Sequence, residues 1–325
     1  MNLSRRTLTT IVKISISAIL VYWLFRRIGL NDVLQWLLSA SWGWILMSIS
    51  AFSLSNMLGA WQWYLLIRSK KINLGFWQVV SFYHIGLFFN NFLISYVGGD
   101  AFRIYDVRKR SGDLTTALST VFFDRFIGFL ALTSLSIFVS LFYMRRLGSH
   151  VSIYPMASLF LMWSGTLFLL FHERSAKRCG LFVRFFFPKV VYRKFREIYY
   201  SINLFKNDKT VLLQAFAIAL FVQSLRILTH YGTARAMGVH GEIYIFFIFI
   251  PLVATAASLP ISVGGIGVRE QSSVTLFGQV GFVGEQVVAF ELLAYFVSIL
   301  TTLPGGIIFA LRRERHHTVQ VTESA

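Results

Sequence analysis

"ISYVGGDAFRIYDVRKR" (residues 94–110) and "ISVGGIGVREQ" (residues 261–271) each interrupt an apolar run with two adjacent glycines and a charged cluster. At an offset of 166 residues the two stretches share the pattern V-G-G-x-x-x-R, which places Arg103 on Arg269. Glycine tolerates backbone angles that other residues avoid and lets other groups approach closely. We therefore expect each stretch to end a half-helix whose tip faces a polar path and not lipid.

The composition around these stretches is typical of a membrane protein. Hydrophobic residues make up 56% of the 325 residues, aromatic residues 17% and charged residues 14%, and the apolar runs recur along the whole chain. This predicts one polytopic helical domain over residues 1–325. The 31 Lys and Arg outnumber the 14 Asp and Glu, but they cluster between apolar runs, where they orient helices and meet anionic headgroups. Membrane lipids are thus the expected partners, and nucleic acid is not.

Eight apolar segments can be marked, and two of them differ from simple spans. The segments lie at about residues 11–25, 44–67, 76–97, 117–143, 151–171, 211–234, 243–260 and 286–311. Roughly 20 residues are needed to cross the hydrocarbon core. The third and seventh end on polar or helix-breaking residues, namely Asn90, Asn91, Gly98, Gly99, Pro260, Gly264 and Gly265. We expect the glycines and the proline to act as hinges.

The loop charges distinguish two topologies. With six full spans and re-entrant segments at 76–97 and 243–260, the cytoplasmic side receives 23 Lys and Arg and the outside 6; eight simple spans give 12 and 17. Because the basic bias of short loops sets orientation, we expect an all-α integral membrane protein of the first kind. Both termini would be cytoplasmic, in a bacterial inner membrane. The basic loop 172–210 fits an amphipathic surface helix or a plain linker equally well.

In this topology the two glycine stretches open from opposite faces, so the halves 44–143 and 211–311 form an inverted repeat. Transporters built in this way bind substrate near the midplane, where broken helices line a polar cavity. Ordinary loops between spans are the alternative interpretation of the glycine stretches. That alternative leaves the charge asymmetry and the repeated spacing as accidents.

Charged residues within apolar segments suggest a polar network at the midplane. Each costs on the order of 2.5 to 3.5 kcal/mol at a helix centre and so must face a partner or water. Asp124 and Arg125 point about 100° apart on a helix, so we expect them to pair with different neighbours. Glu291 matches Arg125 at the repeat offset, and a pairing of the two is electrically sensible. Arg226 adds a further charge; structural ion pairs and a substrate path are both open interpretations.

Arg103 and Arg269 are the best candidates for contact with a substrate, because guanidinium forks fit phosphate bidentately. Asp100 and Glu270 could in principle serve acid–base chemistry. No HExxH, G-x-S-x-G or P-loop motif is present, and the single cysteine, Cys179, excludes an intramolecular disulfide. The sequence therefore predicts neither an enzyme nor a cofactor or metal site.

Three elements together resemble the lysylphosphatidylglycerol synthase transmembrane family, a flippase-like membrane domain. They are "YVGGDAFRIYDVRKRSGDLTTALSTVFFDRFIGFLAL", "SLPISVGGIGVREQ" and "LTTLPGG". The resemblance implies movement of aminoacylated, other anionic or polyprenyl-type lipids between leaflets. It does not extend to the soluble synthase domain of fused members. One departure is Ile94, where the family usually has a proline before the first glycine pair.

The expected function is thus a lipid translocase for a phosphate-bearing lipid, with Asp100, Arg103, Arg269, Glu270, Asn90 and Asn91 near the headgroup. An integral-membrane enzyme or accessory subunit acting on lipid-linked intermediates is the main alternative. A scaffold for envelope-biosynthesis enzymes is a third possibility.

Overall fold

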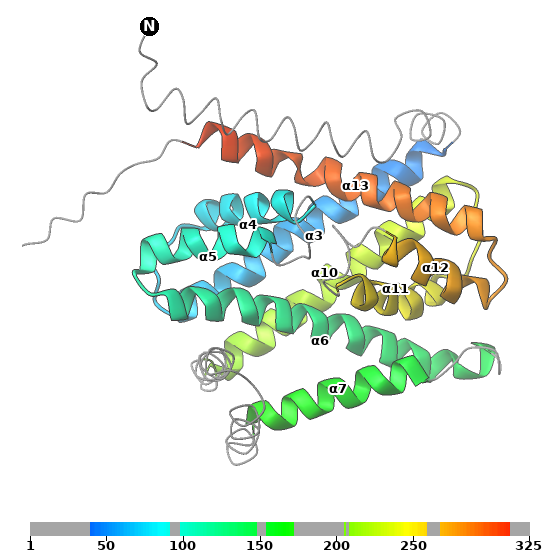
Figure 1. Ribbon diagram of the computed structural model, residues 1–325, viewed down its shortest axis with the longest axis horizontal. Coiled ribbons are helices and arrows are strands. Elements are labelled where there is room, and N and C mark those ends of the chain that lie inside the picture. The colour runs from blue at the N-terminus through cyan, green and yellow to red at the C-terminus, as the bar shows by residue number, and fades with distance from the viewer. Residues whose placement is uncertain are drawn as a thin grey trace, which may run out of the picture.

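The computed structural model describes residues 40–91, 98–147, 154–171, 208–258 and 267–312 together with Phe205, and these ranges contain helices and no strands (Figure 1). The all-α prediction is confirmed. The helices are α3 (Trp42–Ser69), α4 (Phe76–Asn90), α5 (Gly98–Ser111), α6 (Leu114–Leu147), α7 (Tyr154–Phe171), α10 (Lys209–Ala236), α11 (Ile243–Ala257), α12 (Val268–Gly278) and α13 (Gly284–Leu311).

The helix lengths separate spanning helices from shorter ones. Four stretches are long and apolar enough to cross a membrane: Trp42–Ser69, Leu114–Tyr143, Lys209–Ala236 and Gly284–Leu311. A helix of 28 residues, such as α3 or α10, is about 42 Å long. In contrast, α4 and α11 have 15 residues each, about 22 Å, which is less than the roughly 30 Å of a hydrocarbon core. These short helices are the two segments predicted to be re-entrant.

The equivalent helices α3 and α10 pack against each other in antiparallel orientation. At one end the Ser41 N–H donates to the Ala236 carbonyl at 2.9 Å, and at the other Lys70 Nζ lies 2.5 Å from Asp208 Oδ2. Since α3 opens the first half and α10 opens the second, the halves run in opposite directions. This is the arrangement that an inverted repeat requires. In Figure 1 the pairs α4–α5 and α11–α12 accordingly lie at opposite ends of the molecule.

The ends of the helices support the six-span topology over eight simple spans. Arg312 Nη1 lies 2.6 Å from Asp106 Oδ1, so the ends of α13 and α5 meet, and Figure 1 shows them at the same end of the molecule as the end of α3. The turn after α10 packs at the opposite end, where Gly241 contacts Phe282. Eight simple spans require residues 68–75 and 235–242 to share a face, whereas the 28-residue α3 separates them. Segment 11–25 and loop residues 172–204 lie outside the described ranges.

Each short helix packs against a long helix of the other half. On α13, an added Cβ at Gly305 would collide with the His84 carbonyl of α4, and one at Gly306 would lie 2.7 Å from the Phe88 ring. Across the molecule, Ser136 of α6 donates to the Ile248 carbonyl of α11 at 2.9 Å. The two halves therefore interlock around the space between α3, α6, α10 and α13.

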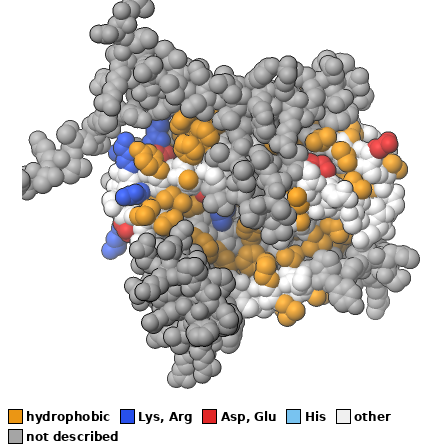
Figure 2. All heavy atoms as spheres, viewed as in Figure 1, with side chains coloured by type: hydrophobic (Ala, Val, Ile, Leu, Met, Phe, Trp, Pro, Cys, Tyr) orange, Lys and Arg blue, Asp and Glu red, His pale blue; other side chains and the backbone are white. Residues whose placement is uncertain are grey.

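Basic side chains collect at one end of the structure. Arg108, Lys109 and Arg110 are exposed at the end of α5, and Figure 2 shows Lys and Arg side chains gathered at the left, over this region. Figure 2 also shows hydrophobic side chains along the central hollow of the molecule.

Candidate functional site

A cavity of about 800 Å³ lies between the two halves and draws its walls from both of them. Its apolar wall includes Phe52, Leu87, Leu118, Phe122, Ile250 and Val253. Its polar wall includes Gln62, Asn90, Asn91, Asp100, Asp124, Arg125, Gln223, Arg226, His230, Arg269, Ser298 and Thr302. A cavity with both kinds of wall suits an amphiphilic ligand, because polar groups fix its orientation and apolar groups bury its hydrocarbon.

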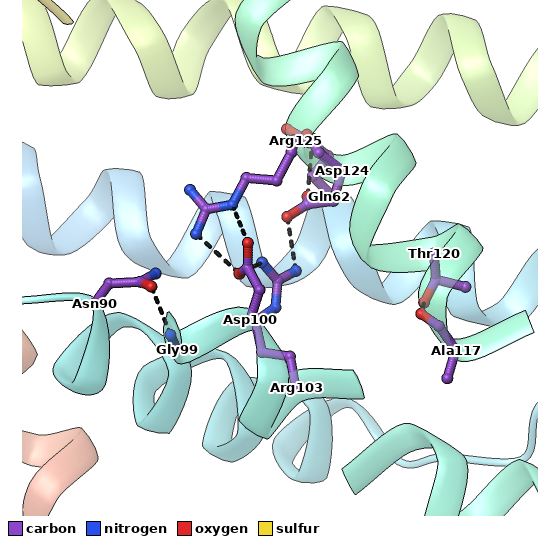
Figure 3. A network of polar contacts seen from close by, with 9 residues as sticks. All are labelled: Gln62, Asn90, Gly99, Asp100, Arg103, Ala117, Thr120, Asp124 and Arg125. Carbon is purple, nitrogen blue, oxygen red and sulfur yellow. Dashed lines mark hydrogen bonds and ion pairs between the residues drawn. The ribbon is translucent and has the colours of Figure 1, made fainter. Parts of the chain in front are cut away.

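On the side of α4, α5 and α6, two acids and two arginines form a closed network (Figure 3). Arg125 donates from Nε and Nη2 to Asp100 at 2.8 and 2.9 Å. Arg103 donates to Asp100 at 3.2 Å and to Asp124 at 2.7 Å. Gln62 of α3 donates to Asp124 Oδ1 at 3.0 Å. All four carboxylate oxygens thus accept hydrogen bonds, and the formal charges of the four ionised groups cancel.

The position of Arg103 corrects the prediction that it contacts a headgroup. Its side chain is 2% exposed, and its guanidinium carbon lies 4.1 Å from the ring centroid of Trp63 and 4.7 Å from that of Tyr83. Both contacts are within cation–π range. Arg103 therefore lies behind the cavity wall and holds Asp100 and Asp124 in place, whereas the neighbouring Arg125 reaches the cavity.

The prediction that Asp124 and Arg125 use different partners is confirmed, but the pairing of Arg125 with Glu291 is wrong. Arg125 pairs with Asp100, whereas Glu291 Oε2 lies 3.2 Å from His230 Nδ1. The two positions are also not equivalent in the repeat, because α6 begins at Leu114 and α13 at Gly284, which is 170 residues later and not 166. When the helix starts are aligned, Arg125 matches Tyr295.

The charged groups on the side of α10, α12 and α13 have different surroundings. Arg269 lines the cavity with its guanidinium carbon 5.2 Å from the Tyr295 ring centroid. Arg226 also lines the cavity, 6.0 Å from the Phe52 ring centroid. Its Nε is buried and, within the part of the chain that the structure describes, has no hydrogen-bond partner. Glu291 is fully buried behind His230 and does not line the cavity.

The other predicted site residues have structural contacts. Asn90 Oδ1 accepts the Gly99 N–H at 2.8 Å and so caps α5. Asn91 donates to Thr302 Oγ1 of α13 at 2.8 Å, and both asparagines line the cavity. Glu270 accepts the Gly267 N–H at 2.5 Å at the start of α12 and is not a wall residue. This capping position disfavours a direct contact of Glu270 with a substrate.

At least one of the predicted hinge glycines allows two helices to pack closely. Gly99 is buried in the first turn of α5, and an added Cβ there would collide with the Gly86 carbonyl of α4. A glycine at this position lets the two helices of the hairpin approach closely. Gly98 begins α5, while Pro260, Gly264 and Gly265 lie outside the described residues. The sequence showed the glycine pair but not what it packs against.

The geometry agrees with comparisons to known proteins. A family model described as "Lysylphosphatidylglycerol synthase TM region" matches residues 10–306. The chain belongs to the lysylphosphatidylglycerol synthase transmembrane family. It is also 24% identical to the UPF0104 membrane protein PH1989 of Pyrococcus horikoshii, over 95% of this chain and 98% of the relative. The resemblance inferred from the sequence is thereby confirmed, and the chain is a multi-pass membrane protein.

The sequence elements that carry the resemblance to the family include the residues that form the structural contacts of the site. The stretch "YVGGDAFRIYDVRKRSGDLTTALSTVFFDRFIGFLAL" supplies Gly99, Asp100 and Arg103 together with their partners Asp124 and Arg125. Sequence reasoning missed one contributor, Gln62, and noted His230 only by its position in the chain. His230 lies one helical turn from Arg226, which places both on one face of α10. That spacing marks His230 in the sequence, whereas an isolated Gln62 in α3 gave no signal.

Proposed function

We propose that this protein binds the phosphate of a membrane lipid in the central cavity and moves the lipid between leaflets. The observation that carries the proposal is the cavity itself, where Arg226 and Arg269 share one space with apolar side chains from several helices. A phosphate needs charged donors, and acyl or prenyl chains need an apolar wall. A lipid is the ligand class that uses both.

Arg226 is the strongest candidate for contact with the phosphate. It lies on the cavity wall, and its Nε is buried without a hydrogen-bond partner among the described residues. An unsatisfied buried donor is costly, and a charged donor more so. A phosphate oxygen would remove this cost, and the guanidinium geometry permits two parallel hydrogen bonds. Arg269, predicted from the sequence, lines the same cavity, whereas Arg103 acts as a positioning residue.

The interlocked halves suggest how a lipid could cross. The pairs α4–α5 and α11–α12 lie at opposite ends of the structure (Figure 1). Movement of one pair at a time would expose the cavity first to one leaflet and then to the other, as in transporters built from inverted repeats. The glycines and Pro260 between the short helices remain the predicted hinges.

The proposal also includes the orientation of the protein in the membrane and its lack of a catalytic role. The basic end, with Arg108, Lys109 and Arg110, would face the cytoplasm, in a bacterial inner membrane with both termini inside. The function needs no catalysis or cofactor within this chain. Its partners would be membrane lipids, together with envelope-biosynthesis enzymes that supply or use them.

The test is lipid transport by the purified full-length chain in liposomes, using fluorescent phosphatidylglycerol. We expect Arg226→Gln and Arg269→Gln each to slow transport by roughly tenfold, the worth of one charge-assisted hydrogen bond. The exposed Arg108→Gln is the matched control and should transport at the wild-type rate. Equal rates for all four proteins, at equal insertion, would refute the headgroup role. Mass spectra should show unchanged lipid; a new lipid species would indicate an enzyme instead.

A further inference from the structure

We propose that the cavity selects lipids whose headgroup is a monoanionic phosphodiester without a cationic group, and that it discriminates against aminoacylated lipids. This narrows the substrate class and rests on the proposed function. The basis is an asymmetry in the cavity: its carboxylates are occupied by the chain's own donors, whereas one of its guanidinium groups is not occupied by an acceptor.

Every carboxylate oxygen on the wall already accepts a hydrogen bond from a donor of the chain itself. Asp100 accepts from Arg103 at Oδ1 and from Arg125 at both oxygens. Asp124 accepts from Arg103 at Oδ2 and from Gln62 at Oδ1. An aminoacyl ammonium that entered the cavity would meet carboxylates whose charge Arg103 and Arg125 already compensate. The closed network thus leaves no ready site for a cationic headgroup.

The other acids do not supply such a site. Glu291 is fully buried and lies behind His230, so an ammonium in the cavity cannot reach it. The stretches that follow α4 and α11, residues 92–97 and 259–266, contain no Asp or Glu. Within the described wall, Asp100 and Asp124 are therefore the acids available to a ligand, and both are already paired.

The cations exceed the acids on the same wall. Three arginines line the cavity, Arg125, Arg226 and Arg269, against the two aspartates. Among the described residues, Arg226 forms no ion pair and has an unsatisfied Nε. A single phosphodiester charge balances this excess, whereas a lysyl-type headgroup adds positive charge beside it. Like charges in a partly desolvated site repel strongly, so specificity arises from rejection as well as attraction.

The experiment measures binding and transport separately. The full-length chain in detergent is incubated with equimolar phosphatidylglycerol and lysylphosphatidylglycerol, and the bound lipid is quantified by native mass spectrometry. We expect the wild type to prefer phosphatidylglycerol by on the order of tenfold. Equal binding, or a preference for the lysyl lipid, would overturn the charge selection.

Variants at Arg226 test whether the preference comes from this residue. Arg226→Gln should reduce the preference toward parity, and Arg226→Glu should favour the lysyl lipid. Arg108→Glu, exposed on α5, makes the same charge change away from the cavity and should keep the wild-type preference. Melting temperatures identify a variant that fails to fold. If Arg226→Glu does not fold, the lipid preference of Arg226→Gln alone tests the role of Arg226. A preference unchanged in both variants would overturn the assignment.

The two proposals fail differently. If phosphatidylglycerol binds selectively but crosses liposomes no faster than without protein, translocation is refuted and the charge selection stands. If both lipids cross at the same protein-dependent rate, translocation stands and the charge selection is refuted.

Discussion

The two halves of this protein have matched helices but use their charges differently. In the first half, Asp100, Arg103, Asp124 and Arg125 form a closed set of ion pairs. In the second half, Arg226 lines the cavity and forms no ion pair with any residue that the structure describes. The two halves of a repeated fold can therefore have different roles, with paired charges in one half and a cation without an ion-pair partner in the other.

The largest expected difference between the two halves is in the free energy of unfolding after an arginine is removed from each. Arg103→Ala leaves two buried carboxylates with fewer partners and should lower the free energy of unfolding by about 3 to 5 kcal/mol. Arg226→Ala removes a cation without an ion-pair partner in the described structure and should change it by less than about 1 kcal/mol. Reversible denaturation in mixed micelles measures both. Similar losses would show that the two halves are equally closed.

We expect alanine substitutions of closely packed glycines to destabilise both halves to a similar extent. Gly99→Ala and Gly305→Ala would each place a Cβ against a backbone carbonyl, that of Gly86 and that of His84. Overpacking of this kind costs typically about 1 to 3 kcal/mol. In Gly165→Ala of α7 the new Cβ would meet nothing within 4 Å, so this control should not be destabilised. A tolerated Gly99→Ala would mean that the α4–α5 hairpin is looser than its packing indicates.

A modest effect is expected outside the spanning segments, at the start of α6. Asp113 accepts the N–H groups of Thr115 and Thr116 at 2.9 and 3.1 Å, and Asp113→Ala should cost about 1 kcal/mol.

The same cap gives a pH dependence. Hydrogen bonds, first that from the Thr116 hydroxyl, hold the pKa of Asp113 below its ordinary value. The folded state therefore favours the charged form, so the stabilisation is present above the ordinary pKa and is lost as pH falls through the lowered one. The difference in melting temperature between wild type and Asp113→Ala should shrink in acid. A constant difference from neutral to acidic pH would contradict this.

The lengths of the apolar segments and the basic loops were enough to predict much of the fold. Crossing a hydrocarbon core imposes a minimum length on any helix, and basic residues near its ends bias its orientation. These constraints act on local sequence, so 76–97 and 243–260 could be recognised as unusual without tertiary information. The repeated V-G-G-x-x-x-R pattern indicated where the short helices end and which residue types gather there.

The partners within the site were decided by tertiary structure. Arg103 and Arg269 match in sequence, yet one lies behind the wall and the other on it. The reason is that helix rotation and close approach, set by contacts such as Gly99 on Gly86, determine where a long side chain ends. The sequence by itself determined that charges must meet partners inside the membrane. Only the packing of helices distant in sequence decided which charges were paired with each other and which faced the cavity.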